Sequence, residues 1–273
     1  MEKHGIFLIL WALEKKAICL LTTRFPSIIL SPFPKNEREA VEMADGRRSA
    51  PEELAAEALE KYFARPGAPR DRVDPWVLGR EVLGYRVEYR RLSPEGDLLG
   101  LTSAGPLWVR VWDRAGAWER LDGRTILLDG SLASPWESPG RRNFTLAHEI
   151  AHLLLCRAVP GAAEKPLCCR SSSEGWEERR ADRLASALLL PEGLVLRGLR
   201  RCALPPSIRV LNPWLDPEGW RRFNTLAGEL GVSRQALALR LRKLGRLRRD
   251  YRPLPRGALD ITMEEDEPCR EST

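Results

Sequence analysis

The sequence predicts an α+β fold that is mainly helical, with a small antiparallel sheet and a C-terminal unit that resembles a helix-turn-helix. Three patterns predict this fold. Short segments before residue 130 alternate apolar and polar residues, as strands do. Longer segments after residue 140 repeat apolar residues at helical spacing. Near the C-terminus, a glycine separates two helical segments, the second of them strongly basic, which indicates a tight helical turn.

The first elements follow one another between residues 51 and 129. Pro51 and the two acidic residues after it predict a helix that runs to about residue 63, where Pro66 and Gly67 break the pattern. A second helix is expected over residues 74–84. Three strands are then expected, at residues 85–92, 107–113 and 125–129.

Residues 148–152 read His-Glu-Ile-Ala-His and include two of the three histidines in the chain. Positions i and i+4 of a helix share one face, so His148 and His152 can bind one metal ion. Zinc binds imidazole, and three protein ligands leave a fourth position for water, from which Glu149 can take a proton. The alternative is a core helix whose histidines bond locally, although buried histidines without a metal or polar partners would be costly.

A third ligand is expected from the helix at residues 174–190, which Pro191 ends. Glu178 lies on the apolar face of this helix, and Glu177 lies close to the same face. Either carboxylate can complete the site, and Asp182 can orient a ligand through a hydrogen bond. The alternative is that Glu177 and Glu178 are solvated acids at the positive end of the helix dipole.

Two segments resemble the ImmA/IrrE family of metallopeptidases. One is Phe-Thr-Leu-Ala-His-Glu-Ile-Ala-His at residues 144–152, and the other is the later helix from Glu178 to Leu-Leu-Leu-Pro at residues 188–191. Leu190 stands where the family usually has Met, a change that conserves volume. The resemblance covers roughly residues 50–250 and implies a zincin-like peptidase domain. It assigns the zinc ligands to His148, His152 and Glu178, and the general base to Glu149.

The resemblance also implies a substrate. Members of the family cleave helix-turn-helix repressors and thereby release stress-response or mobile-element genes. We therefore expect a zinc-dependent endopeptidase with a protein substrate of that kind, and manganese is the alternative metal. We also predict that the strand at residues 125–129 lies at an edge of the sheet and binds extended substrate by strand addition. A purely structural strand is the alternative there.

Residues 226–245 have helix-turn-helix spacing, with Gly231 in the turn and Ser233 as the cap of the second helix. The basic residues that follow are Arg234, Arg240, Arg242, Lys243, Arg246, Arg248 and Arg249. A recognition helix with phosphate-binding arms would bind DNA, whereas a packing unit would turn these charges to water. We favour the packing unit. The rival to the peptidase is a DNA-binding regulator that uses residues 223–249 and has a structural or inactive zinc site.

Composition predicts a cytoplasmic protein that does not enter a membrane. The 273 residues have a net charge of +6 and a pI near 9.2, which suits an acidic partner. No apolar run reaches the about 18 residues of a membrane span. The six cysteines form no C-x-x-C pair, which indicates reduced thiols. Cys156, Cys168 and Cys169 could sense oxidants or close a structural zinc site, and ordinary burial is the alternative.

Four parts are expected along the chain. Residues 1–48 form an N-terminal extension, within which Met43 is the alternative translation start. Residues 49–200 form the peptidase-like domain, and residues 218–250 form the helix-turn-helix-like unit. Residues 251–273 form a flexible acidic tail.

Overall fold

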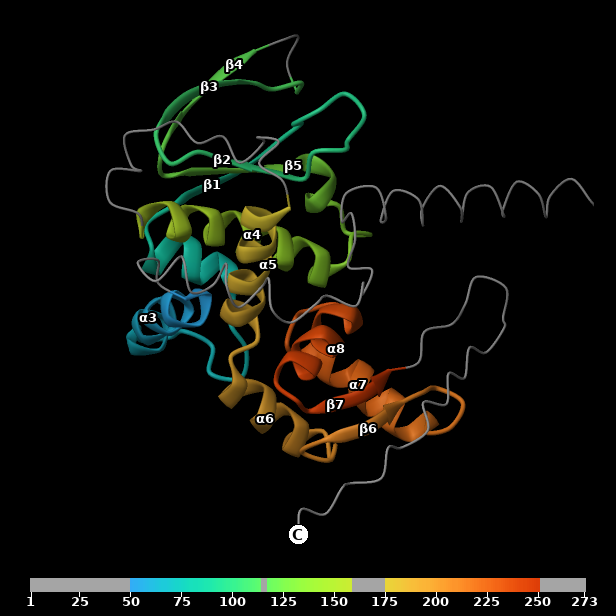
Figure 1. Ribbon diagram of the computed structural model, residues 1–273. Coiled ribbons are helices and arrows are strands. Elements are labelled where there is room, and N and C mark those ends of the chain that lie inside the picture. The colour runs from blue at the N-terminus through green and yellow to red at the C-terminus, as the bar shows by residue number, and fades with distance from the viewer. Residues whose placement is uncertain (1–49, 114–116, 159–174, 251–273) are drawn as a thin grey trace, which may run out of the picture.

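The computed structural model describes residues 50–113, 117–158 and 175–250 (Figure 1). The expectations for residues 1–48, Met43, Cys168, Cys169 and the acidic tail fall outside these ranges. Helices form most of the described secondary structure, and a small sheet precedes the longest helix. The predicted α+β class is therefore confirmed. No helix among the described residues is both long and apolar enough to cross a bilayer.

Three helices form the centre of the molecule. Helices α4 (Pro139–Arg157) and α5 (Trp176–Leu189) cross each other, and α3 (Pro51–Ala64) packs against α5 (Figure 1). A proline opens both α3 and α4, where its missing N–H has no helical partner to lose. The shared core includes Ile150 and Leu146 of α4 and Leu184 and Leu188 of α5, which are fully buried. The apolar faces of α3, α4 and α5 therefore pack together into one hydrophobic core.

The second predicted helix is shorter than expected and has a different form. Residues Val77–Val82 form η1, a π-helix, between α3 and the first strand. Asp74 stabilises the N-terminal end of η1, because the carboxylate of Asp74 accepts a hydrogen bond of 2.9 Å from the backbone N–H of Trp76. Gly79 faces α4, where an added Cβ would lie 3.0 Å from Cδ1 of Ile150. The absence of a side chain at Gly79 lets η1 approach α4 closely.

The sheet has three strands in the order β1 (Arg86–Arg90), β5 (Thr125–Asp129) and β2 (Gly100–Thr102). Strand β5 runs parallel to β1 and antiparallel to β2. The prediction of an antiparallel sheet is therefore wrong in part, because the sheet is mixed. A parallel pair needs a crossover connection, and residues 91–124 supply it by forming β2 and a hairpin before the chain returns.

Strand β5 occupies the centre of the sheet. All five of its residues are buried, and it has a strand partner on each side. The prediction that residues 125–129 form a substrate-binding edge is therefore wrong. The continuous apolar run Ile126, Leu127 and Leu128 is typical of a strand covered on both faces. Among the described strands, β2 is the edge of this sheet that contacts α4.

Strands β3 (Pro106–Arg110) and β4 (Trp118–Asp122) form an antiparallel hairpin. Leu127 of β5 joins a second small core with the hairpin residues Val109 and Leu121. Ile126 and Leu128 belong instead to the main core with the helices. The sheet therefore lies between α4 on one face and the hairpin on the other, as Figure 1 shows. The strand predicted at residues 107–113 corresponds to β3, whereas β2 and β4 have no counterpart in the prediction.

The C-terminal part contains three helices and a pair of parallel strands. Two of these helices, α7 (Pro217–Glu229) and α8 (Arg234–Lys243), meet at Gly231, which has a φ of 67°. The carboxylate of Asp216 accepts a hydrogen bond at the start of α7, and the hydroxyl of Ser233 does so at the start of α8. The two helices and the turn at Gly231 are therefore as predicted. The remaining elements are α6 (Glu192–Arg201), β6 (Ile208–Leu211) and β7 (Leu247–Asp250), together with the short 3-10 turn η2 (Gly130–Ala133) before α4.

Helix α8 packs against α5. Its Leu237 and Leu241 are fully buried. The Nε of Arg240 donates a hydrogen bond of 2.9 Å to the carbonyl oxygen of Leu190, which follows the last turn of α5. Arg240 is therefore a buried residue, not one of the solvent-facing cations that the sequence predicts. These contacts agree with the packing interpretation, and the helix-turn-helix assignment stays a prediction.

Candidate metal centre

Helix α4 places its two histidines next to each other. The rings of His148 and His152 lie one helical turn apart, with centroids 4.6 Å apart and ring planes at 76°. Their Nε2 atoms are 2.9 Å apart. Two lone pairs at that distance repel each other, so a proton or a cation has to lie between them. The opposite side of α4 is held in the core by Ile150 and Leu146.

Helix α5 brings a carboxylate to the same point. Oε2 of Glu178 lies 3.1 Å from Nε2 of His148, and Oε1 lies 3.5 Å from Nε2 of His152. The candidate ligand atoms of these three residues all lie within 4.8 Å of one another. Glu177 is exposed and does not belong to this group among the described residues. Of the two acids that the sequence leaves open, the structure places Glu178 with the histidines.

Asp182 fixes the orientation of one histidine ring. Its Oδ1 lies 2.9 Å from Nδ1 of His148, one helical turn after Glu178 on α5. A carboxylate accepts hydrogen bonds, so Nδ1 of His148 donates and holds the ring proton. Nε2 is then the ring nitrogen that faces the other candidate ligand atoms. This is the contact that a metal-binding histidine usually makes on the side away from the metal.

The cluster attracts positive charge. Burial works against a charge on the ring of His148, yet hydrogen bonds with Asp182 and Glu178 raise its pKa to about 10. Burial also opposes ionisation of Glu178, but hydrogen bonds from His148 and His152 hold the pKa of that carboxyl far below its usual range. Both shifts have the same origin, which is negative charge facing imidazole nitrogens. A divalent cation would satisfy the same electrostatic demand.

Glu149 lies beside this cluster and is only 6 % exposed. Burial raises the pKa of its carboxyl, while the charges of His152 and His148 lower it. Its Oε2 is buried and has no hydrogen-bond partner within the protein. Buried polar atoms without a partner are rare in folded proteins and require an explanation. Oε2 of Glu149 is a buried carboxylate oxygen without a protein partner, and it lies beside the candidate metal ligands. It is therefore suited to accept a hydrogen bond from a water molecule.

Gly100 of β2 lies against the side chain of Glu149 and leaves room for its carboxylate. The sequence analysis did not predict a role for this residue. A Cβ at position 100 would lie 2.8 Å from both Cγ and Cδ of Glu149 and still closer to Oε1. Such distances are shorter than van der Waals contact, so only glycine leaves the carboxylate where it is. The one signal in the sequence is a glycine within a strand, which often marks a close approach of the backbone to another group.

The residues present fit a divalent metal ion. Two imidazole nitrogens and one carboxylate oxygen form a donor set that is typical of catalytic zinc. With zinc–ligand bonds of about 2.0–2.1 Å, tetrahedral ligand atoms lie roughly 3.3 Å apart. The distances of 2.9, 3.1 and 3.5 Å among the three residues lie close to that value. Small side-chain shifts would therefore be enough to hold the ion.

Cys156 does not join this group. It lies one turn beyond His152 on α4 and is a free, half-buried thiol. Among the described residues, the cluster of candidate ligands contains only His148, His152 and Glu178. Burial, and then the charge of Glu177, raises the pKa of the Cys156 thiol, which disfavours the reactive thiolate form. Neither a fourth ligand nor an oxidant sensor is therefore supported at Cys156.

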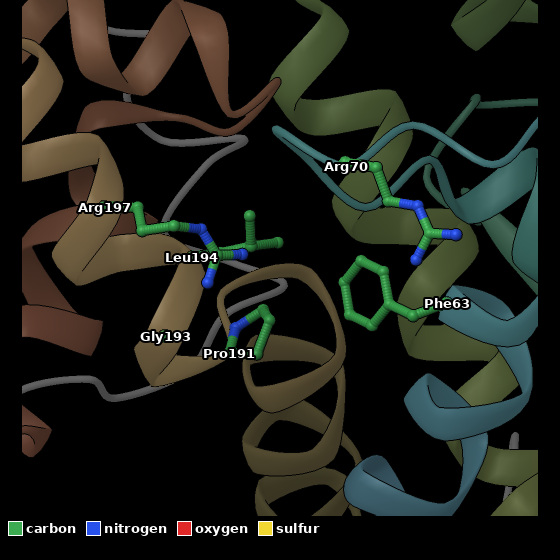
Figure 2. A pocket seen from close by; sticks show the side chains of 6 residues that line it. All are labelled: Phe63, Arg70, Pro191, Gly193, Leu194 and Arg197. Carbon is green, nitrogen blue, oxygen red and sulfur yellow. The ribbon is translucent and has the colours of Figure 1, made fainter.

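A separate pocket of about 430 Å³ lies at the other end of α5. Figure 2 shows Phe63, Pro191 and Leu194 between the exposed side chains of Arg70 and Arg197. Pro191 follows the C-terminus of α5, whereas Glu178 lies in the first turn of that helix. At 1.5 Å per residue these positions are roughly 20 Å apart. The pocket is therefore separate from the candidate metal ligands His148, His152 and Glu178.

Two histidines and a glutamate that meet on two crossing helices form an arrangement typical of metallopeptidases. A family model described as the IrrE N-terminal-like domain, of the peptidase M78 family, matches residues 132–242. This match supports the resemblance to the ImmA/IrrE metallopeptidases that the two sequence motifs indicated. The matched range contains α4 and α5, and hence the whole cluster. No curated protein matches the chain.

Proposed function

We propose that the chain is a zinc-dependent endopeptidase of the H-E-x-x-H, gluzincin-like type. The observation that supports this most directly is the meeting of His148, His152 and Glu178 at one point, with the buried Glu149 beside them. In this proposal the first three residues bind zinc and Glu149 is the general base. The match to the peptidase M78 family supports hydrolysis of peptide bonds as the reaction.

The side chains of the cluster have distinct tasks in this proposal. Zinc supplies Lewis acidity, which lowers the pKa of water and polarises a peptide carbonyl. Glu149 takes a proton from the attacking water onto Oε2 and gives it to the leaving amine. Its burial suits this task, because a raised pKa lets the carboxyl hold the proton between the two transfers. Asp182 holds the ring of His148 in one orientation through Nδ1.

Strand β2 is the element that we propose to align the substrate. It is an edge of the sheet among the described strands, and it contacts α4. Gly100 of this strand touches Glu149. An extended peptide that pairs with the free side of β2 would therefore pass close to the general base. In this role β2 replaces β5, which is enclosed on both sides.

The proposed substrate is a helix-turn-helix repressor, cut to release stress-response or mobile-element genes. The support is the family match at residues 132–242 together with the resemblance of the two motifs. A cytoplasmic location follows from the same proposal, because such a repressor acts on DNA inside the cell. The free thiols of Cys156 and Cys202 are in keeping with a reducing compartment.

The DNA-binding alternative has less support from the C-terminal unit. Several of the cations that would contact phosphate are engaged within the chain: Arg240 is buried, Lys243 pairs with Glu52, and Arg246 pairs with Glu192. A cation held by a carboxylate of its own chain has to leave that partner before it can bind phosphate. The peptidase is therefore the function that the geometry favours.

The decisive experiment compares wild type with Glu149→Gln. Each protein is purified, its zinc content is measured, and each is incubated with the helix-turn-helix repressor encoded nearest to it. We expect equal zinc in both proteins, and a single cut, read by mass spectrometry, with wild type only. A repressor-dependent phenotype that survives Glu149→Gln unchanged would show that peptidase activity is not the function.

Glu177 provides a matched control for the ligand assignment. Glu178→Gln should lose zinc, whereas Glu177→Gln, at the exposed neighbouring position, should keep both zinc and cleavage. Loss of zinc in both variants would point to a general disturbance of α5. Retention of zinc in Glu178→Gln would contradict the proposed ligand set.

A further inference from the structure

The β3–β4 hairpin exposes a face of tryptophan and arginine side chains. The register places Trp108 opposite Arg120, and Arg110 opposite Trp118, so the two residue types alternate across the strands. Trp108 and Trp118 are 62 % and 64 % exposed. We call these four residues the tryptophan–arginine face. Trp112, just beyond β3, extends it, because the guanidinium of Arg110 lies 4.3 Å from the Trp112 ring centroid.

The fold does not need this face. Residues alternate along a strand, and the inward positions Val109 and Leu121 already pack into the small core above the sheet. The outward positions touch no core, so nothing in the hairpin's own packing calls for tryptophan there. A cluster of large exposed aromatic residues usually marks a site of interaction. Tryptophan and arginine are also the residue types most enriched at the energetic centres of protein interfaces.

The charge of the face indicates the chemistry of its partner. Within the part of the chain that the structure describes, Arg110 and Arg120 form no ion pair with a carboxylate. The neighbouring acids are engaged elsewhere: Glu119 pairs with Arg90 on the inward side, and Asp122 accepts hydrogen bonds from Arg124 and Thr125. A complementary surface would therefore present carboxylates between apolar side chains.

The hairpin that bears the face follows the proposed substrate-binding strand directly in the chain. Strand β2 begins at Gly100, beside Glu149, and the chain passes directly from β2 into β3. Trp108 lies eight residues after Gly100. Those eight residues span at most roughly 26 Å at the rise of a β-strand. A protein whose folded part binds to the face could therefore pair an extended segment with β2, and this segment would reach His148, His152 and Glu178.

We infer that the tryptophan–arginine face is a docking surface for the folded part of the protein substrate, which it binds through an acidic and apolar patch. This inference rests on the proposed peptidase function. It assigns recognition of the substrate to a surface outside the metal cluster. Specificity for one protein then comes from the docking surface as well as from the residues around the cut bond.

The test separates docking from cleavage. Two double variants are made, Trp108→Ala/Trp118→Ala and Arg110→Glu/Arg120→Glu. Each is made in the active chain and in the Glu149→Gln background. Trp214→Ala is the control, because Trp214 is 72 % exposed like the hairpin tryptophans but lies between β6 and α7, outside the hairpin. Binding of the fluorescently labelled repressor is measured in the Glu149→Gln proteins. Cleavage by the active proteins is measured with the whole repressor and with a short peptide that spans its cut site.

We expect both double variants to weaken binding of the repressor at least about tenfold, because each removes two residues of the types that contribute most to binding energy at protein interfaces. KM for the whole repressor should rise with kcat unchanged, the short peptide should be cut as by wild type, and Trp214→Ala should have no effect. Circular dichroism and zinc content should match wild type, because the four side chains point away from the core.

Two results would overturn the inference. One is equal binding and cleavage of the whole repressor by the double variants and the control. The other is a single-stranded oligonucleotide that wild type binds and the tryptophan variant does not, while repressor binding is unchanged, because the face would then bind nucleic acid. Failure of the proposed peptidase looks different: no fragment forms with Glu149 intact, whether or not the repressor binds to the face.

Discussion

Gly100 matters because of the side chain that it lacks. In Gly100→Ala the new Cβ would lie 2.8 Å from Cδ of Glu149, so the carboxylate has to move. A shift of about 1 Å in a catalytic group can lower the rate roughly a hundredfold. We therefore expect kcat to fall by one to two orders of magnitude while zinc content stays the same, because Glu149 is not a proposed ligand. Steady-state cleavage and metal analysis of the variant test this.

Gly130→Ala is the matched control for that prediction. A Cβ at Gly130 would meet only the carbonyl oxygen of Arg90, at 4.0 Å, which is an ordinary contact. The two variants make the same chemical change in the same half of the chain. Equal activity in Gly100→Ala and Gly130→Ala would show that the position of Glu149 does not depend on β2.

His148 couples metal binding to pH. Although burial opposes its charge, Asp182 and Glu178 raise the pKa of His148 to about 10 in the metal-free protein. Since the pKa is raised, the proton is bound at neutral pH and a metal ion has to displace it. Zinc affinity should therefore fall about tenfold for each unit by which the pH drops below about 10. Competition with a chelating dye between about pH 6 and pH 8 measures this slope, and an affinity independent of pH would contradict it.

At the scale of single elements, α5 depends on a residue from a distant part of the chain. Arg240 of α8 donates through Nε to the carbonyl oxygen of Leu190, and the guanidinium is buried. Arg240→Ala would leave that carbonyl without its charged partner and open a cavity, at a cost of about 2 kcal/mol. We expect the melting temperature to fall by roughly 4–8 °C, measured by calorimetry on the zinc-free protein.

Lys243 is the control for Arg240 on the same helix. It pairs with Glu52 of α3, but both side chains are 40 % exposed or more. Exposed ion pairs contribute about 0–1 kcal/mol. Lys243→Ala should therefore change the melting temperature by much less than Arg240→Ala does. A similar loss in both variants would mean that the charge of α8, rather than the buried hydrogen bond, stabilises α5.

The elements of this chain differ in how well local sequence predicts them. Helices α4 and α5 are long and have a clear apolar face, and their paired motifs indicate the ligands, so both were predictable. The position of β5 depends on where the chain crosses back over the sheet, which its own five residues do not encode. Strand β2 has three residues, too few for an alternating pattern. Gly100, which lies in β2, was missed for the same reason.

At the scale of the whole molecule, the C-terminal unit is joined to helix α4, which carries the two histidines of the candidate metal centre. The side chain of Asn143 in α4 donates a hydrogen bond of 2.9 Å to the carbonyl oxygen of Gly231, in the turn between α7 and α8. Gly140 in the first turn of α4 also meets this turn, since a Cβ there would lie 2.5 Å from the backbone nitrogen of Ser233. The family match runs through both parts without interruption. Residues 139–157 and 217–243 are therefore expected to unfold together.

The metal ion should stabilise the whole fold, because its ligands come from two helices. A ligand present at one hundred times its dissociation constant stabilises the folded state by about 2.7 kcal/mol. For a protein of this size, removal of zinc with a chelator should lower the melting temperature by roughly 5–10 °C. Calorimetry with and without added zinc measures the shift, and Glu149→Gln should show the same shift as wild type. No shift would show that the cluster does not hold the ion tightly.

The proposed ligands His152 and Glu178 are 26 positions apart in the sequence, yet the two helices that bear them meet at one point. A bound ion would therefore act as a reversible cross-link that ties α4 to α5 in the folded state and has to dissociate before the two helices separate. Unlike a disulfide, this link forms in a reducing compartment and dissolves when zinc becomes scarce. Resistance to cellular proteases should then follow zinc supply, so the abundance of the protein, and not only its activity, would report on the metal status of the cell.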